Sequence, residues 1–176
     1  MRITGGILKG RQVKVPEGII RPAMDRMRES VFAILGDLSQ VSFLDLFSGS
    51  GIIALEAGSR GAVYIEAVEM DPLKRSTLLE NVKISPVRVN CRFIAAELYI
   101  KRAKRPFNII FCDPPFKYKY KWDLLTAIAS SPLMEEGSRL LLHHPKGDNP
   151  DAIPARLTLT DTREYGRSVV DFFDLI

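Results

Sequence analysis

The sequence is poor in the residues that usually mark secreted, metal-binding or membrane-spanning proteins. Its 176 residues include two cysteines, two histidines and one tryptophan. Cys91 and Cys112 each lie in an apolar run, where a buried reduced thiol is expected rather than a disulfide or a metal ligand. No apolar run approaches the roughly 18 residues of a membrane span, and the N-terminus has no secretion signal. We therefore expect a cytoplasmic, monomeric protein of one compact unit that needs neither a metal nor a membrane.

The positive charge is concentrated at one end of the chain. The net charge is +4, yet residues 1–28 hold seven basic side chains against two acidic ones. Smaller basic clusters follow at residues 101–105 (KRAKR) and 117–121 (KYKYK). Such clusters either neutralise phosphates or are simply solvated faces, and the aromatic interleaving of KYKYK favours the first reading. The side chains that we expect to contact nucleic acid are Lys9, Arg11, Arg21, Arg26, Arg28, Lys117, Lys119 and Lys121.

Short apolar runs alternate with helical patterns from residue 43 onward, which is typical of βαβ units and of a parallel sheet covered on both faces. The predicted strands are residues 43–47, 62–68, 87–95, 107–112 and 138–144. The predicted helices are residues 52–61, 71–81, 97–105 and 122–131, the second of them with Asp71-Pro72 at its start. The sequence therefore predicts a doubly covered α/β fold.

Both ends of the chain depart from this alternation. Residues 156–166 and 168–176 are two alternating runs with no room for a crossover helix, so we expect an antiparallel hairpin. Residues 7–16 predict a second, small hairpin with Gly10 at its turn. Residues 23–35 predict an amphipathic helix whose buried face holds Met24, Met27, Val31, Ile34 and Leu35. We accordingly divide the chain into an N-terminal extension, residues 1–38, and a main domain, residues 39–176.

A glycine-containing loop follows the first predicted strand. Residues 48–51 (SGSG) allow the backbone to pass close to a ligand at the carboxyl edge of the sheet. Glu69, at the end of the next strand, is placed to accept both ribose hydroxyl protons of an adenosine. Residues 49–54 also fit the G-x-G-x-x-A pattern of nicotinamide dehydrogenases, and a plain turn beside an incidental acid is a third reading.

Asp45 distinguishes between the two adenosine cofactors. It lies on the strand before the glycines, where a carboxylate attracts the ammonium group of a methionine-type ligand and repels a pyrophosphate. Charge therefore favours S-adenosylmethionine over a nicotinamide dinucleotide.

The segment Asp113-Pro114-Pro115-Phe116 follows the most apolar strand of the chain. The exocyclic amino group of a base is a poor nucleophile, because its lone pair is delocalised into the ring. The Asp113 carboxylate and the Pro114 carbonyl are placed to accept its two N–H bonds and to turn the lone pair toward an electrophilic methyl group. Phe116 is placed to stack on a base turned out of its helix. Alone, a DPP triplet is often a plain turn, but after this cofactor loop it predicts amino methylation.

These motifs resemble those of a known family. The DPPF and DLFSGSG segments resemble class I amino-methyltransferases in general. The segments GG-x-x-KGR (residues 5–11) and RP-x-x-DR-x-RE (residues 21–29) are more specific, and nearly the whole chain resembles the bacterial 16S ribosomal RNA guanine-N2 methyltransferase family often called RsmD. The resemblance implies a Rossmann-like class I methyltransferase fold, with a seven-stranded, mostly parallel sheet and a reversed last strand. It also implies 16S ribosomal RNA, free or within an assembling small subunit, as the partner.

The resemblance assigns residues to the site as well. The S-adenosylmethionine pocket would hold Asp45, Phe47, Ser48, Gly49, Gly51, Glu69, Met70, Ala96 and Glu97. The target guanine would contact residues 113–116, and Arg21, Asp25, Arg26 and Arg28 match the motif beside the active site. Ala96 departs from the pattern, because the family usually has an acid there that meets the adenine amino group. Either Glu97 takes that role, or backbone groups alone bind adenine at a loss of about 0.5–1.5 kcal/mol.

The residues thus predict methyl transfer from S-adenosylmethionine to an amino group, and the resemblance implies that this is the N2 amino group of a guanine in 16S ribosomal RNA. The alternatives are the same chemistry on adenine N6 of DNA or on a protein glutamine, and an RNA-binding module that kept the fold without catalysis. His143 and His144 end a predicted strand, where we expect an ordinary loop role rather than catalysis.

Overall fold

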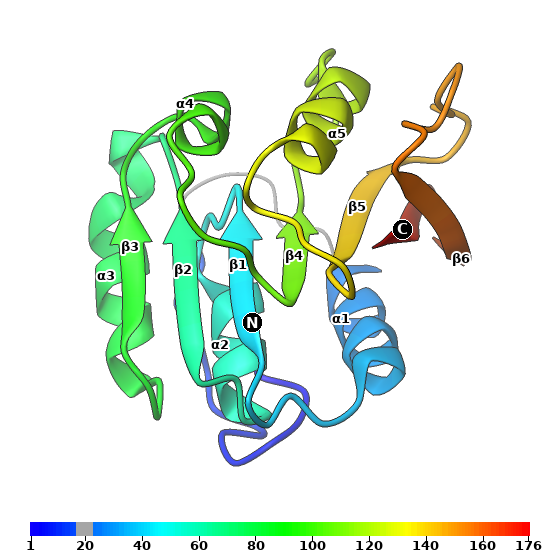
Figure 1. Cartoon of the computed structure of the whole chain (residues 1–176). Coiled ribbons are helices and arrows are strands. Elements are labelled where there is room, and N and C mark those ends of the chain that lie inside the picture. The colour runs from blue at the N-terminus through cyan, green and yellow to red at the C-terminus, as the bar shows by residue number, and fades with distance from the viewer. Residues whose placement is uncertain (17–22) are drawn as a thin grey trace.

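Seven strands of the described chain form one sheet in the order β3-β2-β1-β4-β5-β7-β6 (Figure 1). The computed structural model describes residues 1–16 and 23–176. The strands are β1 (Ser42–Leu46), β2 (Tyr64–Val68), β3 (Val89–Arg92), β4 (Ile109–Cys112), β5 (Arg139–Pro145), β6 (Leu157–Tyr165) and β7 (Ser168–Leu175). Strands β1 to β5 are parallel, whereas β7 lies antiparallel between β5 and β6. The predicted fold class, including the terminal hairpin, is therefore confirmed.

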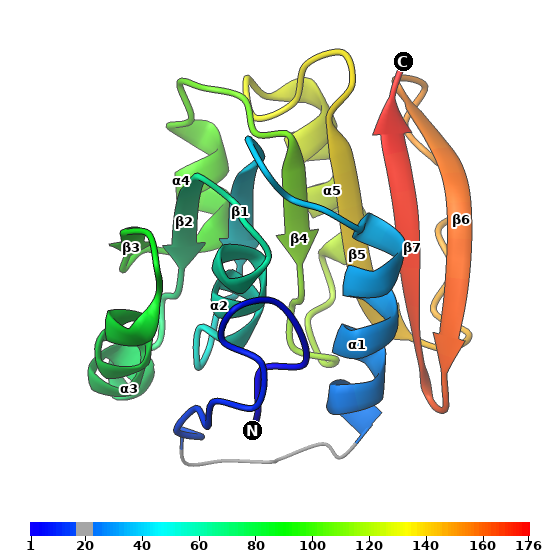
Figure 2. The same cartoon turned by 90° about the horizontal axis from the view of Figure 1, so that it is seen from below.

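Helices cover both faces of the sheet. One face carries α1 (Ala23–Leu35), α2 (Ile52–Ser59) and α3 (Arg75–Asn81), and the other carries α4 (Ala96–Lys101) and α5 (Lys121–Ser130), as Figure 2 shows from below. Each layer packs on its own buried cluster of apolar side chains. Strands β1, β2 and β4 are buried along their length, apart from the partly exposed first residue of β1 and of β2, because both of their faces are covered. Among the described helices, none has the length and apolar character to cross a membrane.

Several predicted elements are shorter in the structure. The third strand was expected over residues 87–95, but β3 ends at Arg92, because among the described strands it lies at the edge of the sheet and pairs only with β2. The helix expected over residues 97–105 ends at Lys101. The helix expected from Asp71 begins as the short 3-10 turn Pro72–Lys74, and the Asp71 carboxylate caps it by accepting from Leu73 N at 2.9 Å. These differences leave the order of elements unchanged.

The N-terminal hairpin forms in a different register from the predicted one. Arg2 and Gln12 make an antiparallel bridge, and the Gly10 N–H donates to Ile3 O at 2.8 Å. The pairing therefore joins residues 1–3 to residues 11–13, and not the two halves of residues 7–16. The reason is burial: Ile3 and Val13 enter the core with α1 and α2, while Ile7 is 77% exposed.

The buried face of α1 also differs from the prediction. Met27 and Val31 are buried as expected, but Ile34 is exposed and Phe32 takes its place in the core. Phe32 stacks on Phe43 of β1 with 6.0 Å between ring centroids. An aromatic contact across the helix–sheet interface thus fixes the rotation of the helix.

Candidate active site

The ends of β1 and β4 lie side by side at one edge of the sheet. The two strands are parallel neighbours, with Leu46 opposite Cys112. The first residue after β4, Asp113, donates its backbone N–H to Leu46 O at 3.3 Å. The loop after β1 and the DPPF loop after β4 therefore leave the sheet at adjacent points, which is where ligands bind in open α/β sheets.

The loop after β1 is held in an unusual backbone conformation. Phe47, Gly49 and Gly51 all have positive φ angles, of 62°, 57° and 82°. Glycine adopts this region freely, but a bulky residue such as Phe47 does so only when its surroundings impose it. A side chain at Gly51 would place Cβ 2.6 Å from Leu78 Cδ1. The loop therefore has one tightly packed path over the start of α2.

Asp45 lies beneath this loop with one oxygen unpaired. Its side chain is 1% exposed, and Oδ2 accepts from Ser48 Oγ at 2.6 Å and from Ala54 N at 3.2 Å. Oδ1 has no hydrogen-bond partner within the described residues. Burial raises the pKa of Asp45 to about 7, and the negative charges of Asp113 and Glu69 add to the shift. A bound ammonium group would pair with Oδ1 and keep this carboxylate charged.

Glu69 ties the end of β2 to the same loop. Its Oε2 accepts from Gly49 N at 2.8 Å, and its Oε1 accepts from Asp71 N at 2.8 Å. Each carboxylate oxygen can accept a second hydrogen bond, so ribose hydroxyls are compatible with this position. Met70, the next residue, is exposed beside it. The buried Asp45 oxygen, the uncrowded backbone at Gly49 and the Glu69 carboxylate fit the amino-acid end and the ribose of S-adenosylmethionine.

The adenine end of the expected pocket involves a residue that the sequence pattern did not single out. Ala96 is buried at the start of α4 and offers no polar side chain, whereas Glu97 is exposed and accepts a short hydrogen bond from Tyr118 Oη. The Tyr118 ring also packs edge-on against Phe47, with 5.5 Å between centroids. The aromatic residues of the KYKYK segment were noted in the sequence, but site roles were expected only for its lysines. Tyr118 thus joins the loops after β1 and β4 to α4.

The DPPF segment forms a turn with a partly open face. Asp113 and Phe116 are partly buried, Pro114 is buried and Pro115 is exposed. The turn closes where Tyr118 N donates to Pro115 O at 2.7 Å. The Asp113 carboxylate is thus neither sequestered in the core nor free in solvent, as a group that receives a base must be.

His143 lies against both ends of this motif. Its Nδ1 is 2.7 Å from Asp113 Oδ1, and its ring is 5.4 Å from the Phe116 ring. The expected loop location is therefore corrected: His143 lies within β5, beside the candidate site. The pairing of β4 with β5 gives His143 this position. Cys112 is opposite Leu142, and the residues that follow these two are Asp113 and His143.

Two of the predicted RNA contacts are wrong. Arg28 is 0% exposed, and its guanidinium donates to Arg2 O and pairs with Asp25 and Glu56. Lys121 is 4% exposed and pairs with Asp148. Both cations are held inside the protein by acidic partners: Asp25, one helical turn away, and Glu56 for Arg28, and Asp148 for Lys121. A cluster of basic residues in the sequence does not reveal such contacts.

The other predicted RNA contacts divide into two groups. Lys117, Lys119 and Arg26 are exposed, and the first two lie on the DPPF loop. Lys9 and Arg11 are also exposed, but the N-terminal turn packs on Ser59, at the far end of α2 from the glycine loop. In Figure 1 this dark blue turn lies at the end of the sheet opposite to the arrowheads. Arg21 is outside the described residues.

Comparisons with known proteins agree with this geometry. The family described as conserved hypothetical protein 95 matches residues 1–174. The Bacillus subtilis protein YlbH is 31% identical over an alignment of 180 positions that covers 98% of each chain. Ribosomal RNA small subunit methyltransferase D of Escherichia coli is 36% identical over an alignment of 121 positions that covers 66% of this chain and 61% of that protein. The solved structure of a hypothetical protein of Thermus thermophilus is similar over 99% of both chains, with 29% identity and a TM-score of 0.84.

Proposed function

The chain belongs to the family described as conserved hypothetical protein 95, and we propose that it transfers a methyl group from S-adenosylmethionine to the N2 amino group of a guanine in 16S ribosomal RNA. The relative named ribosomal RNA small subunit methyltransferase D supports the substrate and agrees with the resemblance found in the sequence. The observation that carries the proposal is that Asp45 and Asp113 lie at the adjacent carboxyl ends of β1 and β4.

The residues for the cofactor follow from the site geometry. Asp45 Oδ1 would accept from the ammonium group, the backbone at Gly49 and Gly51 would lie along the methionine portion, and Glu69 would accept from the ribose hydroxyls. Phe47, Ser48, Met70, Ala96 and Glu97 would complete the pocket. When bound, S-adenosylmethionine supplies a methyl group made electrophilic by a positively charged sulfur. Asp45 and Glu69 also balance that positive charge.

The acceptor would be held by the DPPF loop. The Asp113 carboxylate and the Pro114 carbonyl would accept the two N–H bonds of the base, which fixes the nitrogen and frees its lone pair. Phe116 would stack on the base, an interaction worth about 1–3 kcal/mol. Pro114 and Pro115 restrict the backbone of the loop, so the loop loses little conformational freedom when the base binds.

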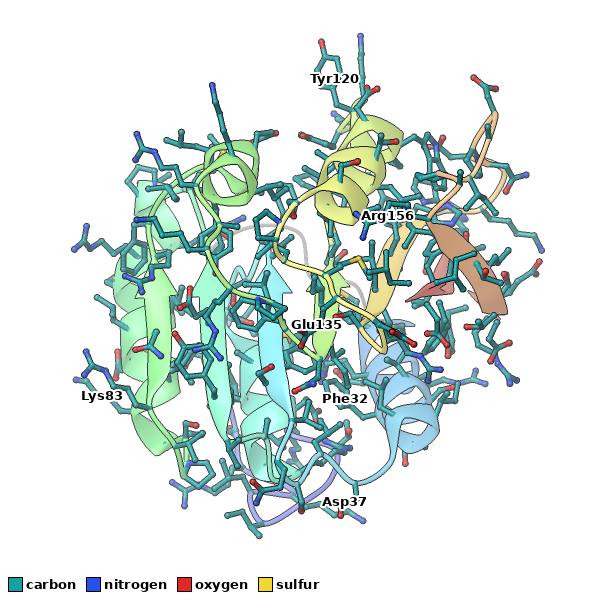
Figure 3. All side chains as sticks on the ribbon, in the orientation of Figure 1. Phe32, Asp37, Lys83, Tyr120, Glu135 and Arg156 are labelled. Carbon is teal, nitrogen blue, oxygen red and sulfur yellow. The ribbon has the colours of Figure 1, made fainter. Side chains whose placement is uncertain are left out.

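The RNA backbone would contact the exposed cations near this loop. Lys117 and Lys119 flank Tyr118, and Tyr120 is 63% exposed beside the start of α5 (Figure 3). Exposed lysines can contact the phosphates of a single RNA strand, and exposed aromatic rings can stack on its unpaired bases. Arg26 would reach the RNA from α1, whereas Lys9 and Arg11 would contact only a substrate that extends past the far end of α2. Whether the partner is free RNA or an assembling subunit stays a prediction, as do the monomeric state, the cytoplasmic location and the lack of a metal.

Labelled methyl transfer to a set of acceptors tests the proposal. The purified protein is incubated with methyl-labelled S-adenosylmethionine and with protein-free small-subunit RNA, small ribosomal subunits, DNA or a glutamine peptide, and the products are identified by mass spectrometry. N2-methylguanosine from RNA or subunits is expected. Label on adenine N6 or on the peptide would favour the alternative acceptors. Calorimetry without detectable cofactor binding would favour a non-catalytic RNA-binding module.

A further inference from the structure

The two histidines of the chain are neighbours in β5 but face opposite sides of the sheet. His143 contacts Asp113 and Phe116, whereas His144 contacts Asp171 on β7, with Nε2 at 2.9 Å from Oδ2, and the Trp122 ring of α5. Both imidazoles are almost fully buried, at 2% and 1% exposure. Only His143 therefore touches the candidate active site, and His144 is a natural control for it.

The hydrogen bond between His143 and Asp113 decides which carboxylate oxygen is left for a substrate. An ionised carboxylate only accepts, so Nδ1 of His143 must carry the proton and donate to Asp113 Oδ1. The 2.7 Å length is that of a strong, charge-assisted hydrogen bond. The rotation of the Asp113 side chain is thereby fixed, and Oδ2 is left to accept from the amino group of a base.

The position of His143 is itself fixed by the sheet. Strand β5 is hydrogen-bonded to β4 on one side and to β7 on the other, with His143 opposite Val170 of β7. Its imidazole lies against Phe116, the residue expected to stack on the base. One buried ring therefore supports both the hydrogen-bond acceptor and the stacking surface of the DPPF loop.

We propose that His143 is a positioning residue for the methyl transfer: it holds the Asp113 carboxylate and the Phe116 ring in the orientation that receives the base. This inference rests on the proposed function. Misplacement of a reacting group by about 1 Å can cost about 100-fold in rate. Loss of His143 therefore lowers kcat much more than it changes the affinity for the cofactor or for RNA.

Isosteric substitutions separate this role from a merely structural one. The side-chain amide nitrogen of asparagine overlies Nδ1 of histidine, and that of glutamine overlies Nε2. His143→Asn keeps the donor to Asp113, whereas His143→Gln and His143→Ala lose it. The matched control is His144→Asn, which changes an equally buried imidazole that has no contact with the DPPF loop.

The measurements are kcat, the KM for each substrate and the midpoint of thermal unfolding for all four variants. We expect kcat about 10- to 100-fold below wild type for His143→Ala and His143→Gln, with KM within about threefold. We expect kcat within about threefold of wild type for His143→Asn and for His144→Asn, even where the unfolding midpoint falls. Equal kcat in the asparagine and glutamine variants of His143, or an unchanged kcat in His143→Ala, would overturn the inference.

A second readout needs no turnover. In nitrogen-15 spectra of the untagged protein, which has only two histidines, the Asp113→Asn substitution should shift the imidazole resonances of His143 and leave those of His144 in place. Unshifted His143 resonances would overturn the inference. A wild-type protein that methylates no acceptor would refute the proposed function and this inference with it, whereas an active wild type with the wrong variant pattern refutes this inference alone.

Discussion

The backbone N–H of Asp113 donates to Leu46 O at 3.3 Å, which joins the end of β4 to the end of β1. Asp45, the residue before Leu46, lies under the glycine loop. Asp45, expected at the cofactor, and Asp113, expected at the base, therefore lie at strand ends that are joined by a hydrogen bond. This closeness is what a direct methyl transfer between two bound reactants requires.

Removal of the Asp113 carboxylate should stop transfer without loss of the cofactor. Asp113→Ala deletes an acceptor for the amino group, so kcat should fall at least about 100-fold. The Kd for S-adenosylmethionine, measured by calorimetry, should stay within about threefold, because Asp113 lies on the base side of the site. Full activity in this variant would remove Asp113 from the mechanism.

The buried carboxylate of Asp45 should make cofactor binding depend on pH. Its pKa is raised to about 7, so below that pH a proton must leave before the ammonium group can pair with it. Affinity should rise about tenfold from about pH 5.5 to about pH 7, a window below the titration of the cofactor's own amino group. Calorimetric titrations of Asp45→Asn should show weaker binding with no such rise. An equal pH dependence in both proteins would contradict the assignment of Asp45.

Ionisation of Asp45 should lower the free energy of unfolding when no cofactor is bound. Because the folded pKa lies above the unfolded value of about 3.9, the folded state binds the proton more tightly, and stability falls as the pH rises from about 4 to about 7. Asp45→Asn removes this loss. In urea unfolding without cofactor, the variant should exceed wild type by about 1–3 kcal/mol at about pH 8, and by less at about pH 5. A variant that is less stable at the higher pH would contradict the raised pKa.

Two lysines of the KYKYK segment should contact RNA and the third should not. Replacement of Lys117 and Lys119 together by alanine should weaken RNA binding and lower the slope of log affinity against log salt by about 2. Lys121→Ala should leave that slope unchanged and cost about 1–2 kcal/mol of unfolding free energy, because it removes the packing of a buried side chain and its ion pair with the partly exposed Asp148. Filter binding over a salt series distinguishes these outcomes, and a reduced slope for Lys121→Ala would contradict its burial.

Two arginines of α1 should behave in the same contrasting way. Arg28→Ala leaves the buried Glu56 with fewer partners and should cost about 3–5 kcal/mol in urea unfolding. Arg26 is exposed, so Arg26→Ala should change stability by less than about 0.5 kcal/mol and weaken RNA binding instead. Stability of Arg28→Ala close to wild type would show that the buried network matters little.

Local sequence pattern predicted those features that local physics determines. Alternation of apolar runs with helical segments gave the β1 to β5 units, and the short connection between residues 166 and 168 required a hairpin. The glycine loop and the DPPF segment could be recognised because each consists of consecutive residues whose chemistry indicates a function. The ends of the elements were less predictable, since β3 ends at the residue opposite the end of its neighbour β2.

Contacts between distant segments could not be predicted in this way. Arg26 and Arg28 are two residues apart and look alike in the sequence, but only Arg28 meets Glu56 of α2. Lys119 and Lys121 differ because Asp148, from the loop after β5, reaches only the second. His143 is placed beside Asp113 by the pairing of β4 with β5. A signal was present in principle, since a polar residue at the end of the strand beside β4 must lie next to DPPF.

The most direct test of the central claim is to map methylated guanines in small-subunit ribosomal RNA from cells that lack this protein. Mass spectrometry of RNA fragments would be compared between the deletion strain and the same strain supplied with wild type or with Asp113→Ala. We predict that one N2-methylguanosine is missing in the deletion strain, returns with wild type and stays missing with Asp113→Ala. An unchanged set of guanine modifications in all three strains would contradict the account.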